Sequence, residues 1–120
     1  MARYVDGFLL AVPKKKVAAY KKMSTAAGKI WKELGALEYR ECIGDDLRIK
    51  GMARFPLAVK AKSNETVAFS WIVYRSRAHR DRVNARVMKD PRMHDPVMLG
   101  AMPFDVKRFA MGGFEVLVGW

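Results

Sequence analysis

Two segments of the chain alternate with the two-residue period of β-strands, yet both faces of each predicted strand are apolar. In residues 3–12 one face carries Tyr4, Phe8, Leu10 and Val12, and the other carries Val5, Leu9 and Ala11. Residues 66–74 read TVAFSWIVY, and this β-branched and aromatic composition is typical of a central strand. Because a strand with two apolar faces has to be covered on both sides, these segments belong at the centre of a sheet between two layers of protein.

A helix and a further strand separate these two segments. Apolar residues at spacings of three and four predict a helix over residues 17–34, and Gly35 can adopt the left-handed conformation that ends it. Alternation over residues 36–43 predicts the next strand. Residues 44–65 hold two glycines and one proline between short apolar pieces, so we expect a long connection with one brief strand near residues 57–60.

The last third of the chain repeats the change from helix to strand. Ser76 is a suitable N-cap for a helix that runs to about Lys89, before Asp90-Pro91. Residues 93–104 are predicted to be irregular, and residues 108–118 form a last strand that Gly112-Gly113 interrupts. The order βαββαβ predicts an α+β fold, in which a four-stranded antiparallel sheet carries both helices on one face.

Two helices cover only one face of such a sheet, so the second apolar face needs another cover. An exposed apolar area of several hundred Å² usually marks an interface in a soluble protein. We therefore expect a second copy of the chain to pack against this face, sheet to sheet. The alternative is that the long connections fold over the open face of a monomer.

Composition sets the class of protein and the compartment. The chain has 120 residues, of which 51% are hydrophobic, and this is enough apolar surface for one folded domain spanning residues 1–120. Its single cysteine, Cys42, excludes an internal disulfide and is expected to be a packed structural residue. The longest apolar run, residues 8–12, is far too short to span a membrane, and residues 1–6 lack the pattern of a signal peptide. We therefore expect a reduced, cytoplasmic protein without membrane contact.

Four blocks of the sequence carry a resemblance to a known family. They read YVDGFLLAVPKKKVAAYKKM, ALEYRECIGDDL, TVAFSWIVYRSRAHRDRVNARVMKDPRM and MPFDVKRFAMGGFEVLV. Together they span nearly the whole chain and resemble the YbaA-like family of bacterial proteins, whose domain has no known function. The resemblance implies a ferredoxin-like βαββαβ unit that dimerises through its sheets as a dimeric α+β barrel.

This barrel is also similar, more distantly, to those of cofactor-independent monooxygenases, muconolactone isomerases and stress-response proteins. Those proteins bind small organic molecules between the sheet and the helices. Because similarity of fold does not identify a ligand, the resemblance implies a pocket and no particular molecule.

Six residues are candidates for lining that pocket, and two of them are carboxylates placed among aromatic side chains. Asp6 has the strand parity of Tyr4 and Phe8, and Glu41 lies between Tyr39 and Ile43. Desolvation among aromatics suits a carboxylate to proton transfer, whereas pairing with an arginine would make it structural. The full set of candidate pocket residues is Asp6, Tyr39, Glu41, Trp71, Tyr74 and His79.

His79 lies early in the second helix, where it either faces the pocket or is an exposed histidine near a helix N-terminus. The chain has two histidines and one cysteine without metal-ligand spacing, so we expect no metal site. It also lacks a glycine-rich phosphate loop, a nucleophile elbow and a dinucleotide fingerprint, so no cofactor is expected.

The charge of +11 is concentrated on the two helices. Such faces attract polyanions, and the candidates for contacting one are Arg77, Arg80, Arg82 and Arg86. A sheet that binds RNA, however, displays stacking aromatics and a strand that begins with a basic residue and glycine, and VAFSWIVY lacks that beginning. A solvated helix surface is the simpler interpretation, and binding of nucleic acid stays an alternative.

The sequence thus predicts a cytoplasmic homodimer that binds a small organic molecule between sheet and helices. Two alternatives belong to other classes of function. One is a protein that binds RNA or another polyanion through its basic helices, and the other is a cofactor-independent monooxygenase or isomerase-like enzyme.

Overall fold

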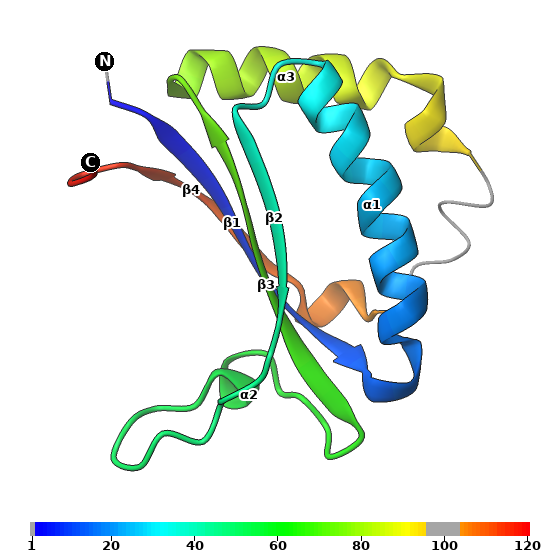
Figure 1. Ribbon diagram of the computed structural model, residues 1–120, viewed down its shortest axis with the longest axis vertical. Coiled ribbons are helices and arrows are strands. Elements are labelled where there is room, and N and C mark those ends of the chain that lie inside the picture. The colour runs from blue at the N-terminus through cyan, green and yellow to red at the C-terminus, as the bar shows by residue number, and fades with distance from the viewer. Residues whose placement is uncertain (1, 96–103) are drawn as a thin grey trace.

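The computed structural model describes residues 2–95 and 104–120 and contains a four-stranded antiparallel sheet in the order β2-β3-β1-β4 (Figure 1). The strands are β1 Tyr4–Pro13, β2 Glu38–Ile43, β3 Glu65–Tyr74 and β4 Ala110–Glu115. The helices are α1 Val17–Glu33, α2 Phe55–Ala58 and α3 Arg77–Lys89, with single 3₁₀ turns at Lys14–Lys16, Pro91–His94 and Val106–Arg108. The predicted α+β class, with its βαββαβ order, is confirmed.

One terminus of each long helix lies where its capping residue predicts: Ser76 precedes the start of α3, and Gly35 follows the end of α1. The Ser76 hydroxyl accepts a hydrogen bond from the backbone N–H of His79 at 3.1 Å, which satisfies a free donor at the start of α3. Gly35 adopts a φ of +125°, a conformation that side chains disfavour, and the chain turns there from α1 towards β2.

The helices α1 and α3 lie on the same side of the sheet, and the main core fills the space between (Figure 1). The two central strands pair along their whole length, from Tyr4 opposite Tyr74 to Pro13 opposite Glu65. The buried apolar side chains of this core are Tyr4, Leu10, Val12, Tyr20, Ile30, Ala36, Ala68, Ile72, Tyr74, Val83 and Val87. The strand parity predicted from the sequence is therefore correct for β1 and β3.

The brief strand predicted for residues 57–60 is wrong. Residues 55–58 form the short helix α2, because Pro56 occupies the first turn of a helix, where its missing N–H costs nothing. The last strand is also shorter than predicted, and Gly112-Gly113 does not interrupt it, since β4 pairs with β1 without a bulge. Of the segment predicted to be irregular, residues 96–103 lie outside the described residues.

Within residues 2–95 and 104–120, the face of the sheet opposite α1 and α3 is covered only at one end. There Val59, from the connection that contains α2, is buried against Ala11 and Val67. Elsewhere on this face large apolar side chains remain in contact with solvent, and Phe69 and Phe114 are 47% and 62% exposed. The long connection therefore covers only a small part of this face.

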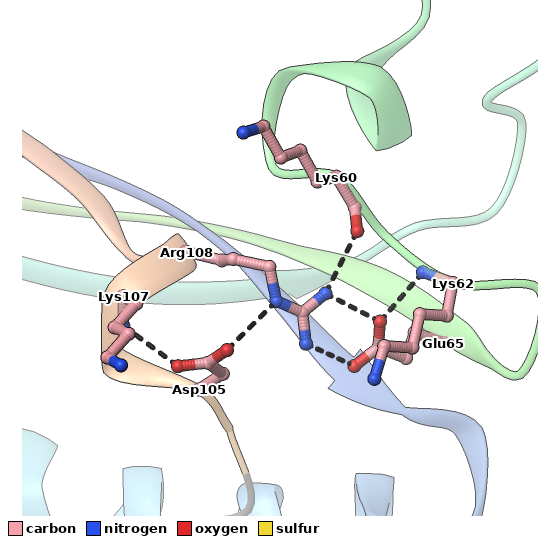
Figure 2. A network of polar contacts seen from close by, with 6 residues as sticks. All are labelled: Lys60, Lys62, Glu65, Asp105, Lys107 and Arg108. Carbon is pink, nitrogen blue, oxygen red and sulfur yellow. Dashed lines mark hydrogen bonds and ion pairs between the residues drawn. The ribbon is translucent and has the colours of Figure 1, made fainter.

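An ion-pair cluster joins the end of that connection to the segment before β4 (Figure 2). Both oxygens of the Glu65 carboxylate accept hydrogen bonds from the Arg108 guanidinium, at 2.7 and 2.8 Å. Arg108 also donates to the backbone carbonyl of Lys60 and to the carboxylate of Asp105. The side chain of Glu65 is only 7% exposed, so this bidentate pair is largely shielded from water. Through its contacts with Lys60, Glu65 and Asp105, Arg108 joins the end of the long connection, the start of β3 and the segment before β4.

The pair makes the stability of the fold sensitive to acid. The hydrogen bonds from Arg108, followed by one from the backbone N–H of Lys62, lower the pKa of Glu65 from 4.5 to about 2. A carboxyl whose pKa is lower in the folded state stabilises the fold above its unfolded pKa, and the stabilisation is lost as pH falls towards the folded pKa.

We therefore expect Glu65→Gln to flatten the acid limb of the stability profile. Between pH 5 and pH 2 the wild-type free energy of unfolding should fall by roughly 2 kcal/mol more than that of the variant, measured by urea titration. Asp90, which lies outside this cluster, also has a lowered pKa, but it titrates in both proteins and cancels in the difference. Parallel pH profiles would contradict the prediction.

Candidate functional site

Two adjoining cavities lie along α1, on the side of the helix that faces the sheet. The inner cavity, of about 280 Å³, lies between α1 and the sheet, and the outer groove, of about 540 Å³, lies between α1 and β2. Four residues line both of them, namely Tyr20, Ser24, Tyr39 and Glu41. These residues form a small polar centre, because most of the other residues that line the inner cavity are apolar.

Glu41 is the centre of this group. Its carboxylate accepts hydrogen bonds from the Tyr20 hydroxyl, at 2.9 and 3.1 Å to its two oxygens, and from the Tyr39 hydroxyl at 3.2 Å. Tyr20 comes from the sheet-facing side of α1, whereas Tyr39 and Glu41 are neighbours on one face of β2. Two phenol hydroxyls therefore hydrogen-bond to this partly buried carboxylate.

Both phenols keep their protons over the physiological pH range. Burial raises the pKa of Tyr20, and the adjacent negative charge of Glu41 raises it further. The same two causes, in the same order, raise the pKa of Tyr39. The tyrosines are consequently hydrogen-bond donors to Glu41 and not proton acceptors.

The negative charge of Glu41 has no cationic partner among the described residues. No nitrogen of a lysine, arginine or histidine in residues 2–95 and 104–120 lies within 4.0 Å of its carboxylate. The neighbouring Ser24 is 4% exposed, and its hydroxyl oxygen has no hydrogen-bond partner within 3.5 Å, although it lies near enough to the Tyr20 hydroxyl to oppose the rise in the pKa of that group. A buried hydroxyl without a partner and a carboxylate without a counterion are both uncommon inside a protein.

Gly28 sets how closely α1 approaches β2. A Cβ atom at this position would lie 2.8 Å from two ring carbons of Tyr39, so a larger residue would push the ring or the helix away. The Tyr39 ring also packs against Trp31, with ring centroids 6.3 Å apart. This close approach holds Tyr39 beside Glu41.

Asp6, the other predicted carboxylate, belongs to a separate cluster under α3. It is 2% exposed, and its carboxylate accepts hydrogen bonds from Arg80 Nη1 at 3.0 Å and from Asn84 Nδ2 at 3.3 Å. The Asn84 Oδ1 in turn accepts from Trp31 Nε1 and from the Tyr74 hydroxyl, both at 3.1 Å. Asp6 is thus paired with an arginine, the arrangement that indicates a structural role and not proton transfer.

Tyr74 belongs to the same cluster. Burial and the nearby charge of Asp6, in that order, raise the pKa of its hydroxyl, so Tyr74 also acts as a neutral donor. Neither Asp6 nor Tyr74 lines the inner cavity or the outer groove.

The last two candidates for the pocket lie elsewhere. His79 accepts a hydrogen bond from the backbone N–H of Arg75 through Nδ1 at 3.0 Å, and it lines neither cavity. Its pKa is lowered by burial and by the charges of nearby arginines. Trp71 points to the opposite face of the sheet, where its indole N–H donates to Glu38 at 3.4 Å. Of the six predicted residues, the structure places only Tyr39 and Glu41 at the cavities.

Sequence reasoning missed Tyr20 and Ser24 as site residues. Both lie on the apolar face of α1, four positions apart, and are therefore one above the other on the helix. A serine in the middle of an apolar helix face was the signal available. Cys42, expected to be packed, is exposed, because β2 is an edge strand and presents it away from the core.

The four arginines proposed to contact a polyanion do not form one surface. Arg77, Arg82 and Arg86 are exposed on α3. Arg80 points towards the sheet, where it pairs with Asp6, and its guanidinium carbon lies 4.9 Å from the centre of the Tyr4 ring. Arg80 is therefore engaged within the fold.

Within the described residues, no group of three or more histidine, cysteine, aspartate or glutamate side chains is arranged to hold a metal ion. The helices of residues 2–95 and 104–120 are all too short or too polar to cross a membrane.

Residues 3–106 match the model of a protein family described as "Protein of unknown function (DUF1428)". The chain is 46% identical over 116 residues to the uncharacterized protein YbaA of Escherichia coli K12, with 97% of each chain covered. Among solved structures, a dimeric ferredoxin-like protein from an uncultured marine organism covers 100% of both chains, with a TM-score of 0.63 and 13% identity. A variant of SnoaB, a cofactor-independent oxygenase from Streptomyces nogalater, matches with a TM-score of 0.55 and 11% identity over 99% of this chain and 97% of that one. At such identities the two structures support the ferredoxin-like fold alone.

Proposed function

The chain belongs to the DUF1428 family of proteins of unknown function, and we propose that it binds a small, largely apolar organic molecule in the inner cavity. The observation that carries this proposal is a cavity of about 280 Å³ with apolar walls and one polar centre. Pockets for small molecules usually combine an apolar lining with a few polar groups that orient the ligand, and this cavity lies near the lower end of their size range.

The polar centre supports the same conclusion. The unpartnered hydroxyl of Ser24 costs about 1–3 kcal/mol if it stays without a hydrogen bond. A ligand that hydrogen-bonds there, with its apolar part against α1 and the sheet, removes this cost.

A pair of neighbouring alanines on α1 provides the test. Ala27 lines the inner cavity, whereas Ala26 is exposed on the same helix. We expect Ala27→Phe to fill the cavity and to weaken binding of a small apolar probe, neopentylbenzene, by on the order of tenfold or more. Ala26→Phe should leave the affinity within about twofold of wild type, which is the scatter expected of a surface change.

Methyl NMR of the methionines measures this binding directly. Met23 and Met93 line the cavity, and the exposed Met52 and Met88 serve as internal references. Neopentylbenzene should shift the first two signals and leave the references in place. The proposal fails if the probe shifts neither Met23 nor Met93, or if Ala27→Phe binds as well as wild type.

We also propose that the protein works as a homodimer whose copies meet through their open sheet faces. Apolar side chains of three strands meet there, and the hollow that they line, of about 600 Å³, includes Val5, Leu9, Phe69, Trp71 and Phe114. A similar fold, from the uncultured marine organism, is described as dimeric. Burying these residues against a second copy would remove the exposed apolar patch from water.

A further inference from the structure

The lining of the inner cavity combines aromatic side chains with a single charge. Six aromatic side chains contribute to it, namely Phe8, Tyr20, Trp31, Tyr39, Phe104 and Phe109. Glu41 is the only residue with a formal charge among the described residues that line it, and no lysine, arginine or histidine is present there. The cavity therefore carries a net negative charge, although the chain as a whole carries +11.

These groups match the chemistry of an organic cation. Aromatic rings present the negative face of their quadrupole, which attracts ammonium groups, most strongly where water is excluded. A partly buried carboxylate without a counterion favours the same charge. We propose that the ligand of the inner cavity is a small organic cation, an ammonium group with apolar substituents, and that Glu41 is its counterion. This inference rests on the proposed function and names the class of its ligand.

The lysines of the outer groove do not reverse this preference. Lys21, Lys29 and Lys32 line the groove where it opens to solvent, and their side chains are exposed, so water and salt screen their charges. Lys32 is also engaged, because its ammonium group donates to the backbone carbonyl of Leu37 at 2.7 Å. An anionic ligand in the inner cavity would instead place its charge beside Glu41 in a region of low polarity, which is unfavourable.

Two probes of the same shape separate charge from apolar contact. Benzyltrimethylammonium and neopentylbenzene differ by one atom, a positively charged nitrogen in place of carbon. We expect isothermal titration calorimetry on the full chain to show the cation binding on the order of tenfold more tightly than its neutral isostere. This comparison uses the wild-type protein and does not depend on whether a variant folds.

Glu41→Gln should reduce the affinity for the cation by about tenfold and leave that for neopentylbenzene within about twofold. Glu38→Gln is the matched control, because it removes the same charge from β2 on the other face of the sheet, where Glu38 contacts Arg40 and Trp71. That variant should bind both probes as wild type does.

The outcomes distinguish this inference from the function on which it rests. If neopentylbenzene binds as tightly as the cation, or if Glu41→Gln leaves the preference intact, the cation assignment is overturned and the apolar binding site stands. If neither probe binds, the proposed function and this inference both fail. Tighter binding of the carboxylate analogue 2,2-dimethyl-3-phenylpropanoate, in which a carboxylate replaces one methyl group of neopentylbenzene, than of the cation would likewise overturn the assignment of charge.

Discussion

Asp6→Ala is expected to lower the free energy of unfolding by about 3 kcal/mol or more. The Asp6 carboxylate is buried and accepts hydrogen bonds from Arg80 at 3.0 Å and Asn84 at 3.3 Å. Removing it takes away the buried counterion of the Arg80 guanidinium, whose side chain is 19% exposed, and leaves only the exposed Asp81 as its partner. It also removes the acceptor of Asn84, the residue through which Trp31 and Tyr74 are linked to α3.

Urea unfolding at a fixed protein concentration measures this loss, because association would otherwise contribute to the apparent stability. Asp81→Ala is the control, since Asp81 also lies 2.9 Å from Arg80 but is 62% exposed, and it should cost less than about 1 kcal/mol. Replacing both partners, Asp6→Leu with Arg80→Met, should recover most of the loss, because no charge is left buried alone. A loss for Asp6→Ala no larger than that for Asp81→Ala would contradict the structural role.

Phe69→Lys is expected to convert a dimer into a monomer. Phe69 lies in the middle of the open sheet face, is 47% exposed, and packs against Phe55 and Trp71. At a two-fold interface each substitution places two ammonium groups in an apolar contact, where the cost of desolvating them is high. The side chain is already half in contact with water, so the fold of the single chain should tolerate the change.

Light scattering coupled to size-exclusion chromatography checks this at micromolar concentration. The wild type should have twice the chain mass of 13.6 kDa and the variant the mass of one chain. Met88→Lys, a change of the same kind at a 53% exposed position on α3, should leave the dimer intact. A wild type of 13.6 kDa would refute the homodimer, and a dimeric Phe69→Lys variant would refute this face as its interface.

Local signals in the sequence were sufficient for most of the secondary structure. Ser76 and Gly35 mark helix ends because capping depends on neighbouring backbone groups. The short helix at residues 55–58 was mistaken for a strand because an apolar piece of four residues has no resolvable period, and the position of Pro56 decided the outcome.

The candidate site was predicted only in part. Strand parity grouped Asp6 with Tyr4 and Phe8, and Glu41 with Tyr39, and the pocket expected between sheet and helices put both groups on the helix side, where the structure has them. Trp71 and Tyr74 are three positions apart in one strand, so their side chains lie on opposite faces of the sheet. The strand pattern therefore did not support placing both of them in one pocket. Ser24 was missed because its hydroxyl becomes unusual only once it is known to be buried.

By itself the sequence determined the order of the two long helices and the four strands of the sheet, the apolar character of both sheet faces and the apolar neighbours with which each carboxylate shares a strand face. These properties depend on periodicity and on caps, which act over a few residues. Only the tertiary structure decided that Asp6 meets Arg80, 74 positions away, whereas Glu41 meets Tyr20 beside a cavity. The two carboxylates look alike in the sequence, and they differ because α3 brings a cation to one, while α1 brings only phenol and hydroxyl groups to the other.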